Sequence, residues 1–279
     1  MTRHSMLRTG IFTVFILLVW PALAESIGVA PHAVFMSDQQ RLAEVTLFNS
    51  SSATEEVELA FQYGFPVADS TGRMVVALDP DPGPDDPSAA GWLRAFPRRV
   101  RVEAGQRQTI RVQASPPDDL AQGEFWSRLI ITSRAASPRG VPVDSGVSTT
   151  VNIQFRTIIS VNYRNGDVST AVSLDSLWAE AAPDTLRAWV DLDRGGNAAF
   201  LGSAVLTLES PDGSVVLRSD PYQVAVYRPL RRWFALPVEG LAPGDYTLRI
   251  VISTEREDLD PEDVIPAPAV EGSVRVTIS

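Results

Sequence analysis

The chain has 279 residues, a net charge of −10 and no cysteine. Its 24 basic residues are all arginine. Without cysteine, neither a disulfide framework nor a thiolate metal site is available, so each domain must be held together by its hydrophobic core. The acidic balance argues against nucleic acid as a partner.

The N-terminus has the pattern of a secretory signal peptide. Arg3 and Arg8 precede an apolar run over residues 11–20, and Ala22 to Ala24 supply the small residues of a cleavage site. We therefore expect a signal peptide over residues 1–24 and an exported mature protein. Its retention as a membrane anchor is the alternative, although the run is shorter than the ~20 residues that a membrane span needs.

Residues 27–164 read as short runs in which apolar and polar residues alternate. Val57, Leu59, Phe61 and Tyr63, for example, alternate with more polar neighbours. Alternation of this kind places one face of a strand in a core, and we count seven or eight such strands without helical periodicity. The pattern predicts an antiparallel β-sandwich.

The longest alternating run covers residues 147–163. Its apolar odd positions are Val147, Val151, Ile153, Phe155, Ile159, Val161 and Tyr163. As a single strand it would span about 55 Å, against the ~17–20 Å of an ordinary strand. Either it pairs with another chain, or it bends and serves two sheets or two domains of its own protein.

The second half continues with strands up to residue 278. Leu241, Pro243, Gly244 and Tyr246 resemble the tyrosine corner of immunoglobulin and fibronectin type III sandwiches, in which the hydroxyl binds the backbone of the corner. Asn-Gly-Asp at residues 165–167 suits a short linker. We therefore expect an all-β protein with two immunoglobulin-like antiparallel β-sandwich domains, over residues 25–165 and 166–279.

Several segments of the first half together resemble the periplasmic pilus-assembly chaperones, the PapD-like family. The resemblance covers almost all of residues 27–164, whereas nothing in residues 168–279 clearly matches the second domain of the family. The segments that carry it are residues 29–35 (VAPHAVF), 43–49 (AEVTLFN) and 96–112 (FPRRVRVEAGQRQTIRV), Leu120 and Glu124, and the ending Tyr163-Arg164 of the long strand.

This resemblance implies donor-strand complementation, in which the chaperone lends its long strand to a pilus subunit that lacks one. It implies a periplasmic location, a pilus or surface-fibre subunit as the protein client, and an outer-membrane usher as a further candidate partner. The subunit-binding side chains would be Val151, Ile153, Phe155 and Ile159. The alternative is that these side chains face the core of their own domain.

The residues that anchor the client in the family are absent. Family members bind the terminal carboxylate of the subunit with an arginine and a lysine, and these positions fall on His32 and Ser160 here. A charge-assisted contact needs a cation. The candidates for the anchor are therefore His32, Arg156 and Arg164.

Other clusters offer little chemistry. The only histidines are His4 and His32, which leaves no material for a catalytic triad or a histidine metal site. The acidic runs at residues 79–87 and 255–263 are interpreted as solvated loops. Three arginines lie beside Tyr227, Trp233 and Phe234, either as a protein-binding patch or because these rings divide between core and surface.

The sequence thus predicts a non-catalytic periplasmic chaperone-like protein that assists the folding and assembly of pilus or surface-fibre subunits by β-strand donation. No cofactor, metal, small-molecule substrate or nucleic acid is expected. The alternative is an envelope or cell-surface β-sandwich protein with an adhesive or structural role and no chaperone activity. An envelope hydrolase is a further, less favoured alternative.

Overall fold

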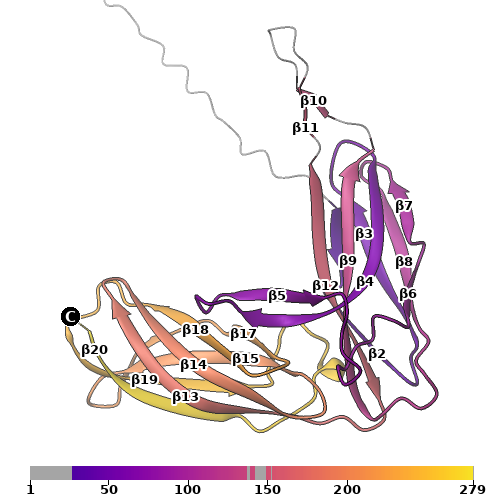
Figure 1. Ribbon diagram of the computed structural model, residues 1–279. Coiled ribbons are helices and arrows are strands. Elements are labelled where there is room, and N and C mark those ends of the chain that lie inside the picture. The colour runs from indigo at the N-terminus through magenta and orange to yellow at the C-terminus, as the bar shows by residue number, and fades with distance from the viewer. Residues whose placement is uncertain (1–26, 137–138, 142–148, 152, 279) are drawn as a thin grey trace, which may run out of the picture.

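The computed structural model describes residues 27–136, 139–141, 149–151 and 153–278. The predicted signal peptide lies outside this part of the chain. The described residues form strands and one short 3-10 helix, Pro261–Asp263. Among them, no helix is long and apolar enough to cross a membrane. The expected all-β class is confirmed, with two β-sandwiches that meet at an angle (Figure 1).

The first sandwich packs two sheets face to face. One sheet has the order β1 (Ile27–Ala30), β3 (Leu42–Asn49), β8 (Arg107–Ala114) and β6 (Leu93–Phe96). The other has the order β2 (Ala33–Ser37), β12 (Gln154–Asn165), β9 (Gly123–Ala135), β4 (Glu55–Ala68) and β5 (Met74–Asp79), with β7 (Arg99–Val102) also beside β4. The alternating residues of these strands fill the core between the sheets, as the sequence pattern predicts.

The N-terminal chain belongs to both sheets. The strand β1 pairs antiparallel with β3, and after Pro31 and His32 the chain continues as β2, which pairs parallel with β12. The connection that passes from one sheet to the other is only two residues long. It brings the N-terminal chain beside the lower half of β12, from Ser160 to Arg164.

Asn49 fixes the turn that follows β3. Its side chain is fully buried, and its Nδ2 donates to the carbonyl oxygens of Ala53 and Val102 at 2.7 and 2.8 Å. Its Oδ1 accepts from the backbone N–H of Ser51 at 2.9 Å. A single amide thus satisfies three backbone groups that this turn would leave without partners.

The second sandwich packs a smaller sheet against a larger one. The smaller sheet has the order β13 (Thr170–Ala182), β14 (Thr185–Gly196) and β18 (Leu230–Pro237). The larger has the order β16 (Val215–Arg218), β15 (Phe200–Glu209), β19 (Gly244–Ser253) and β20 (Val270–Ile278), with β17 (Tyr222–Val226) also beside β15. The tyrosine corner is confirmed, because the Tyr246 hydroxyl donates to the carbonyl oxygen of Ala242 at 2.7 Å.

The single long strand predicted over residues 147–163 is wrong in its extent. A short strand β11 (Thr149–Val151) pairs with β10 (Arg139–Val141), and β12 starts only at Gln154 and runs on to Asn165. The physical reason is the length of the partner: Gln154 pairs with Arg134, next to the end of β9 at Ala135. Residues 147, 148 and 152 of the predicted strand lie outside the described residues.

Candidate functional site

The upper half of β12 has a free edge. The strand β9 pairs with β12 along its whole length, from Gln154 to Asn165, whereas β2 pairs only with Ser160 to Arg164. Within the described part of the chain, residues 154–159 therefore have a neighbouring strand on one side only, and we call them the free edge. An unpaired edge offers backbone donors and acceptors to a strand of another chain.

The side chains at the predicted binding positions divide along the strand. Ile153, just before β12, is 60% exposed, and Phe155 is half-buried. Ile159 is only 1% exposed and packs in the core of the first sandwich, as Val161 and Tyr163 do. The structure thus removes Ile159 from the residues that a client can reach, because the opposite sheet already covers it. The side chain of Val151 lies outside what the structure describes.

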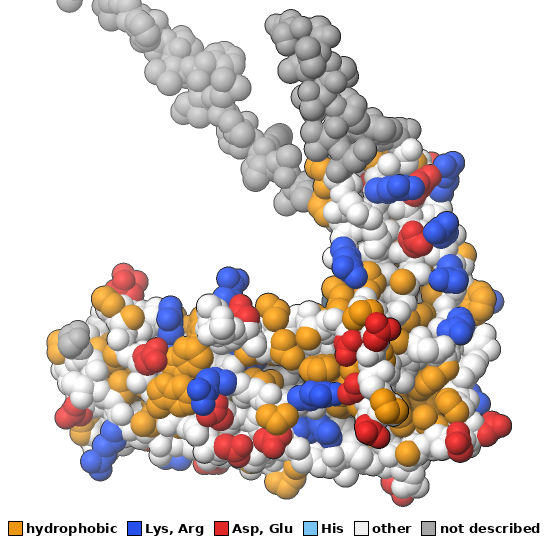
Figure 2. Space-filling model, viewed as in Figure 1, with side chains coloured by type: hydrophobic (Ala, Val, Ile, Leu, Met, Phe, Trp, Pro, Cys, Tyr) orange, Lys and Arg blue, Asp and Glu red, His pale blue; other side chains and the backbone are white. Residues whose placement is uncertain are grey.

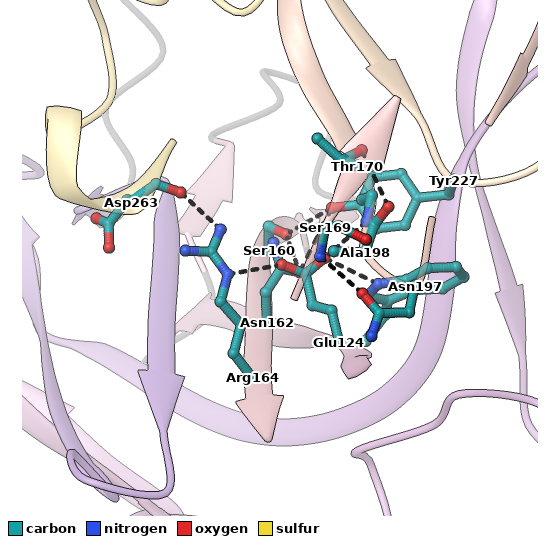
Figure 3. Close-up of polar contacts among 12 residues, drawn as sticks. Glu124, Ser160, Asn162, Arg164, Ser169, Thr170, Asn197, Ala198, Tyr227 and Asp263 are labelled. Atoms are coloured by element: carbon teal, nitrogen blue, oxygen red, sulfur yellow. Dashed lines mark hydrogen bonds and ion pairs between the residues drawn. The ribbon is translucent and has the colours of Figure 1, made fainter. Parts of the chain in front are cut away.

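A buried carboxylate joins the two sandwiches at the base of β12 (Figure 3). Oε1 of Glu124 accepts from Nε1 of Trp126 at 3.0 Å and from the backbone N–H of Ala199 at 3.1 Å, and Oε2 accepts from Nε of Arg164 at 3.0 Å. Arg164 also donates from Nη2 to the carbonyl oxygen of Asp263 at 2.6 Å. Charge-assisted bonds of this kind are strong where water is excluded.

Arg164 is therefore occupied within the molecule. Its side chain is 14% exposed and that of Glu124 is fully buried, so withdrawal of the guanidinium would leave an uncompensated buried carboxylate. The interpretation of Arg164 as an anchor for a client carboxylate is corrected accordingly. Arg156, the second candidate, is exposed on β12 and lines a separate hollow with residues of β4 and of the loop after Asp79.

A cleft of about 640 Å³ lies between the two sandwiches, beside the half of β12 that pairs with β2. His32 and Ser160, the positions at which the resemblance places the anchor pair, both line it, together with Asn162 of β12 and Tyr227 of the second sandwich. The Ser160 and Tyr227 hydroxyls donate to Oδ1 of Asn162 at 3.1 and 3.4 Å. On the face that Figure 2 shows, charged and hydrophobic side chains lie side by side where the two sandwiches meet.

Two arginines of the cleft keep donors that no acceptor in the described chain satisfies. Arg128 is 6% exposed; its Nε donates to the carbonyl oxygen of Gly64 at 3.0 Å, whereas Nη2 has no partner. Arg232 donates from Nη1 to the carbonyl oxygen of Gln223 at 3.0 Å, whereas Nε has no partner. Nδ2 of Asn162 is likewise buried and unpaired. Buried donors without acceptors are rare in folded proteins, and they mark a site where an acceptor can bind.

The lining of the cleft carries three arginines, Arg128, Arg232 and Arg256, and three aspartates, Asp258, Asp260 and Asp263, and their surroundings differ. Burial lowers the pKa of Arg232 to about 10, because this guanidinium loses water without a carboxylate beside it. Arg256, by contrast, is neutralised by two bonds to Asp258, both 2.6 Å long. Burial raises the pKa of Asp263, which lines the same cleft. Arg128 and Arg232 thus give the cleft the capacity to bind a carboxylate.

Sequence reasoning missed Arg128 and named Arg232 only as one of three arginines in a candidate protein-binding patch. Arg128 is a charged residue within the otherwise apolar core of β9, where Leu129, Ile130 and Ile131 follow it. A lone arginine in a buried strand is a usable signal, because a charge is rarely buried without a partner. Arg232 gives no such signal, since the run Arg231-Arg232-Trp233 reads equally well as a solvated strand.

Comparison with known proteins gives matches among solved structures only. No protein-family model matches the chain, and no curated protein sequence matches it. Among solved structures, the YadV chaperone is 15% identical, with a TM-score of 0.43 over 90% of this chain and 99% of that one. The CsuC chaperone, solved with the CsuE tip adhesion subunit of Acinetobacter baumannii, is 12% identical, with a TM-score of 0.43 over 88% and 97%. The SafB chaperone, solved with the SafA pilin of Salmonella enterica, is 14% identical, with a TM-score of 0.42 over 90% and 97%.

Proposed function

We propose that this protein is a non-catalytic, periplasmic chaperone-like factor that binds a pilus or surface-fibre subunit by strand donation, without a cofactor. The observation that carries the proposal is the free edge of β12, with the exposed Ile153 and the half-buried Phe155 at its upper end. The proposal includes the division of the chain into a signal peptide (residues 1–24) and two domains (residues 25–165 and 166–279).

Binding at the free edge follows from the geometry of a sheet. A client strand beside residues 154–159 would extend the sheet β2-β12-β9-β4, with main-chain hydrogen bonds as the source of affinity. Side chains two residues apart point to the same face of the strand, so Val151, Ile153 and Phe155 would enter successive pockets of the client. The client would thereby cover the apolar surface that the free protein leaves in water.

The cleft would hold the terminal carboxylate of the client. Arg128 and Arg232 carry unsatisfied N–H groups that could donate hydrogen bonds to a carboxylate oxygen, and Asn162 adds a neutral donor. His32 lines the same cleft and would take a secondary part. Because Ser160 and Asn162 of β12 line the cleft, a chain end anchored there would also fix the register of a strand paired further up β12.

The experiment is co-expression of this chain with candidate pilus or surface-fibre subunits from the same genome, followed by affinity purification of this chain. Ile153→Ser combined with Phe155→Ser is expected to reduce the co-purified subunit at least tenfold, because the client loses two apolar contacts of about 1.5–3 kcal/mol each. The thermal midpoint of the free protein should stay close to its original value.

The matched control is Leu42→Ser. Leu42 is 62% exposed, much like Ile153, but it lies on β3 in the opposite sheet. This control should retain the subunit. If the folded double variant retains as much subunit as the original chain, strand donation is contradicted. If the bound subunit is never displaced from this chain by another subunit, a structural role is favoured instead.

The anchor is tested on both partners. Arg232→Gln should weaken the complex, and so should an extension of the subunit by several residues beyond its natural C-terminus. If both changes break the same contact, their combination should cost little more than either alone, whereas independent effects would add. Additive losses would show that Arg232 does not bind the chain end.

A further inference from the structure

Three tryptophans form a row across the outer face of the second sandwich. Trp178 of β13 lies opposite Trp189 of β14, and Trp189 lies opposite Trp233 of β18. The rings of Trp178 and Trp189 are stacked, with centroids 5.7 Å apart and planes 3° from parallel. Arginines cover both ends of the row: Arg231 lies 5.2 Å from the ring centre of Trp178, and Arg187 lies 5.1 Å from that of Trp233.

The row is interrupted by a piece of the first sandwich. The hairpin of β4 and β5 extends from the first sandwich along the second (Figure 1), and its turn at residues 69–73 reaches the tryptophans. A Cβ added to Gly72 would lie 2.6 Å from Cζ3 of Trp189 and 2.6 Å from Cδ1 of Trp233. The backbone of Gly72 is thus wedged between these two indoles, at a distance that only glycine permits.

Local bonds hold the tip in this position. Gly72 has φ of +79°, a conformation that favours glycine, and its N–H donates to the carbonyl oxygen of Asp69 at 2.9 Å. Oδ1 of Asp69 accepts from the N–H and the hydroxyl of Thr71 at 2.8 and 2.6 Å. Nε1 of Trp233 donates to the carbonyl oxygen of Thr71 at 2.8 Å, which bonds the tip to the second sandwich.

We propose that the hairpin tip, clamped between Trp189 and Trp233, is a latch that fixes the angle between the two sandwiches. Contacts at the base of the molecule already join the sandwiches, among them the bond between Glu124 and Ala199, the packing of Trp126 against Tyr227, with ring centroids 4.8 Å apart, and the bond of Arg228 to the Tyr63 hydroxyl. Contacts near a hinge leave rotation about it possible, whereas a further contact at the end of a long arm opposes that rotation. Domains of one chain move relative to each other unless their interface is extensive.

The latch also determines the shape of the cleft. Pro66, Met74 and Val76 of the same hairpin line the cleft together with His32 and Arg232. Met74 in addition packs against the core of the second sandwich. An opened latch would therefore change the distance between the two walls of the cleft. The inference itself does not depend on the proposed client, since it concerns the geometry of the free protein.

The test measures the distance between the sandwiches directly. The chain has no cysteine, so spin labels on Gln106→Cys and Glu239→Cys, both exposed, are unique. Pulsed electron-electron double resonance should give a narrow distance distribution between the two labels when the rest of the chain is unchanged. Trp233→Ala and Gly72→Val should each widen it by about twofold or more, since the tip then loses its place between the indoles and only the contacts nearer the base, such as those of Met74 and Glu124, remain.

Trp178→Ala is the matched control, because this indole lies in the same row but on the far side of Trp189 from the hairpin. It should leave the distribution narrow. Gly72→Val alters only the first sandwich, so it decides the question even if Trp233→Ala fails to fold. Narrow distributions in folded Gly72→Val, or equal widening by Trp178→Ala, would overturn the latch.

Discussion

The two halves of β12 carry the same alternation of apolar and polar residues, yet they have opposite surroundings. From Ile159 downward, Ile159, Val161 and Tyr163 are at most 1% exposed in the core of the first sandwich, and β2 pairs alongside from Ser160. At the upper end, Ile153, just before β12, is 60% exposed, and the backbone edge of residues 154–159 is free. Alternation shows that one face of a strand avoids water, but the opposite sheet decides whether its own protein covers that face.

The polar groups repeat this contrast. At the base of β12, Glu124 and Arg164 form an ion pair, and each also forms a hydrogen bond to the backbone of the second sandwich. These bonds join the two sandwiches. In the cleft beside it, Arg128, Arg232 and Asn162 each retain a buried donor without an acceptor. One region uses its interactions for folding, and the other leaves them available, which is typical of binding sites.

The largest expected effect comes from the lower half. Ile159→Ser should lower the free energy of unfolding by about 3–5 kcal/mol, because it opens a cavity and buries a hydroxyl. Ile153→Ser, the same change six residues earlier on the same face, should stay within about 0.5 kcal/mol. Urea denaturation of both variants measures the difference, and equal losses would end the distinction between the two halves.

The next effect concerns the base of the strand. Arg164→Met should lower the free energy of unfolding by about 3 kcal/mol, because Glu124 would remain buried without its cation. Arg156→Met, on the exposed face of the free edge, should cost almost nothing by comparison. Thermal unfolding of the two variants provides the measurement. A stable Arg164→Met protein would show that the backbone and indole donors alone satisfy Glu124.

The cleft should respond with the opposite sign. Arg232→Met should raise the free energy of unfolding by roughly 1 kcal/mol, since it removes a desolvated cation that has no carboxylate partner. The same variant should bind the client less tightly. Calorimetry of the free protein checks the first part, and a loss of stability would mean that Arg232 serves the fold and not the binding site.

The smallest effect is expected at the hairpin tip, which finds its partner within the chain as the lower half of β12 does. Hydrogen bonds from Thr71, the hydroxyl first, hold the pKa of Asp69 below its ordinary value. Its support of the turn is therefore complete above the ordinary pKa and is lost as the pH falls through the lowered value. Hydrogen exchange at Thr71 and Arg73, corrected for intrinsic rates, should lose protection in acid, whereas Asp69→Asn should show no such titration.

Local patterns predicted the fold well because they report on faces and turns. The alternation from Val57 to Tyr63 predicted a strand of the first sandwich, and Tyr246 predicted the tyrosine corner of the second sandwich. Phe234 is 1% exposed while Trp233 lies on the outer face, so these rings divide between core and surface. The corner depends on residues only four apart, and the alternation depends on none beyond the strand.

The binding surface depended on partners far away in the sequence. Ile159 is buried because the sheet opposite β12 covers it, which no local pattern encodes. The break before Gln154 reflects the end of β9, more than 15 residues earlier. The unpaired donors of Arg128 and Arg232 could not be foreseen, since a residue lacks a partner only in the context of the whole fold.

The position of the crossing at Pro31 and His32 determines how much of the β12 edge stays free. Because β2 runs parallel to β12 and begins with Ala33 opposite Ser160, an earlier crossing would cover more of β12 and a later one would uncover more. Each shift by two residues adds or removes one side chain on the dry face. Small insertions or deletions before Ala33 would therefore adjust the length of free backbone edge that this protein offers to another chain, without any change in β12 itself.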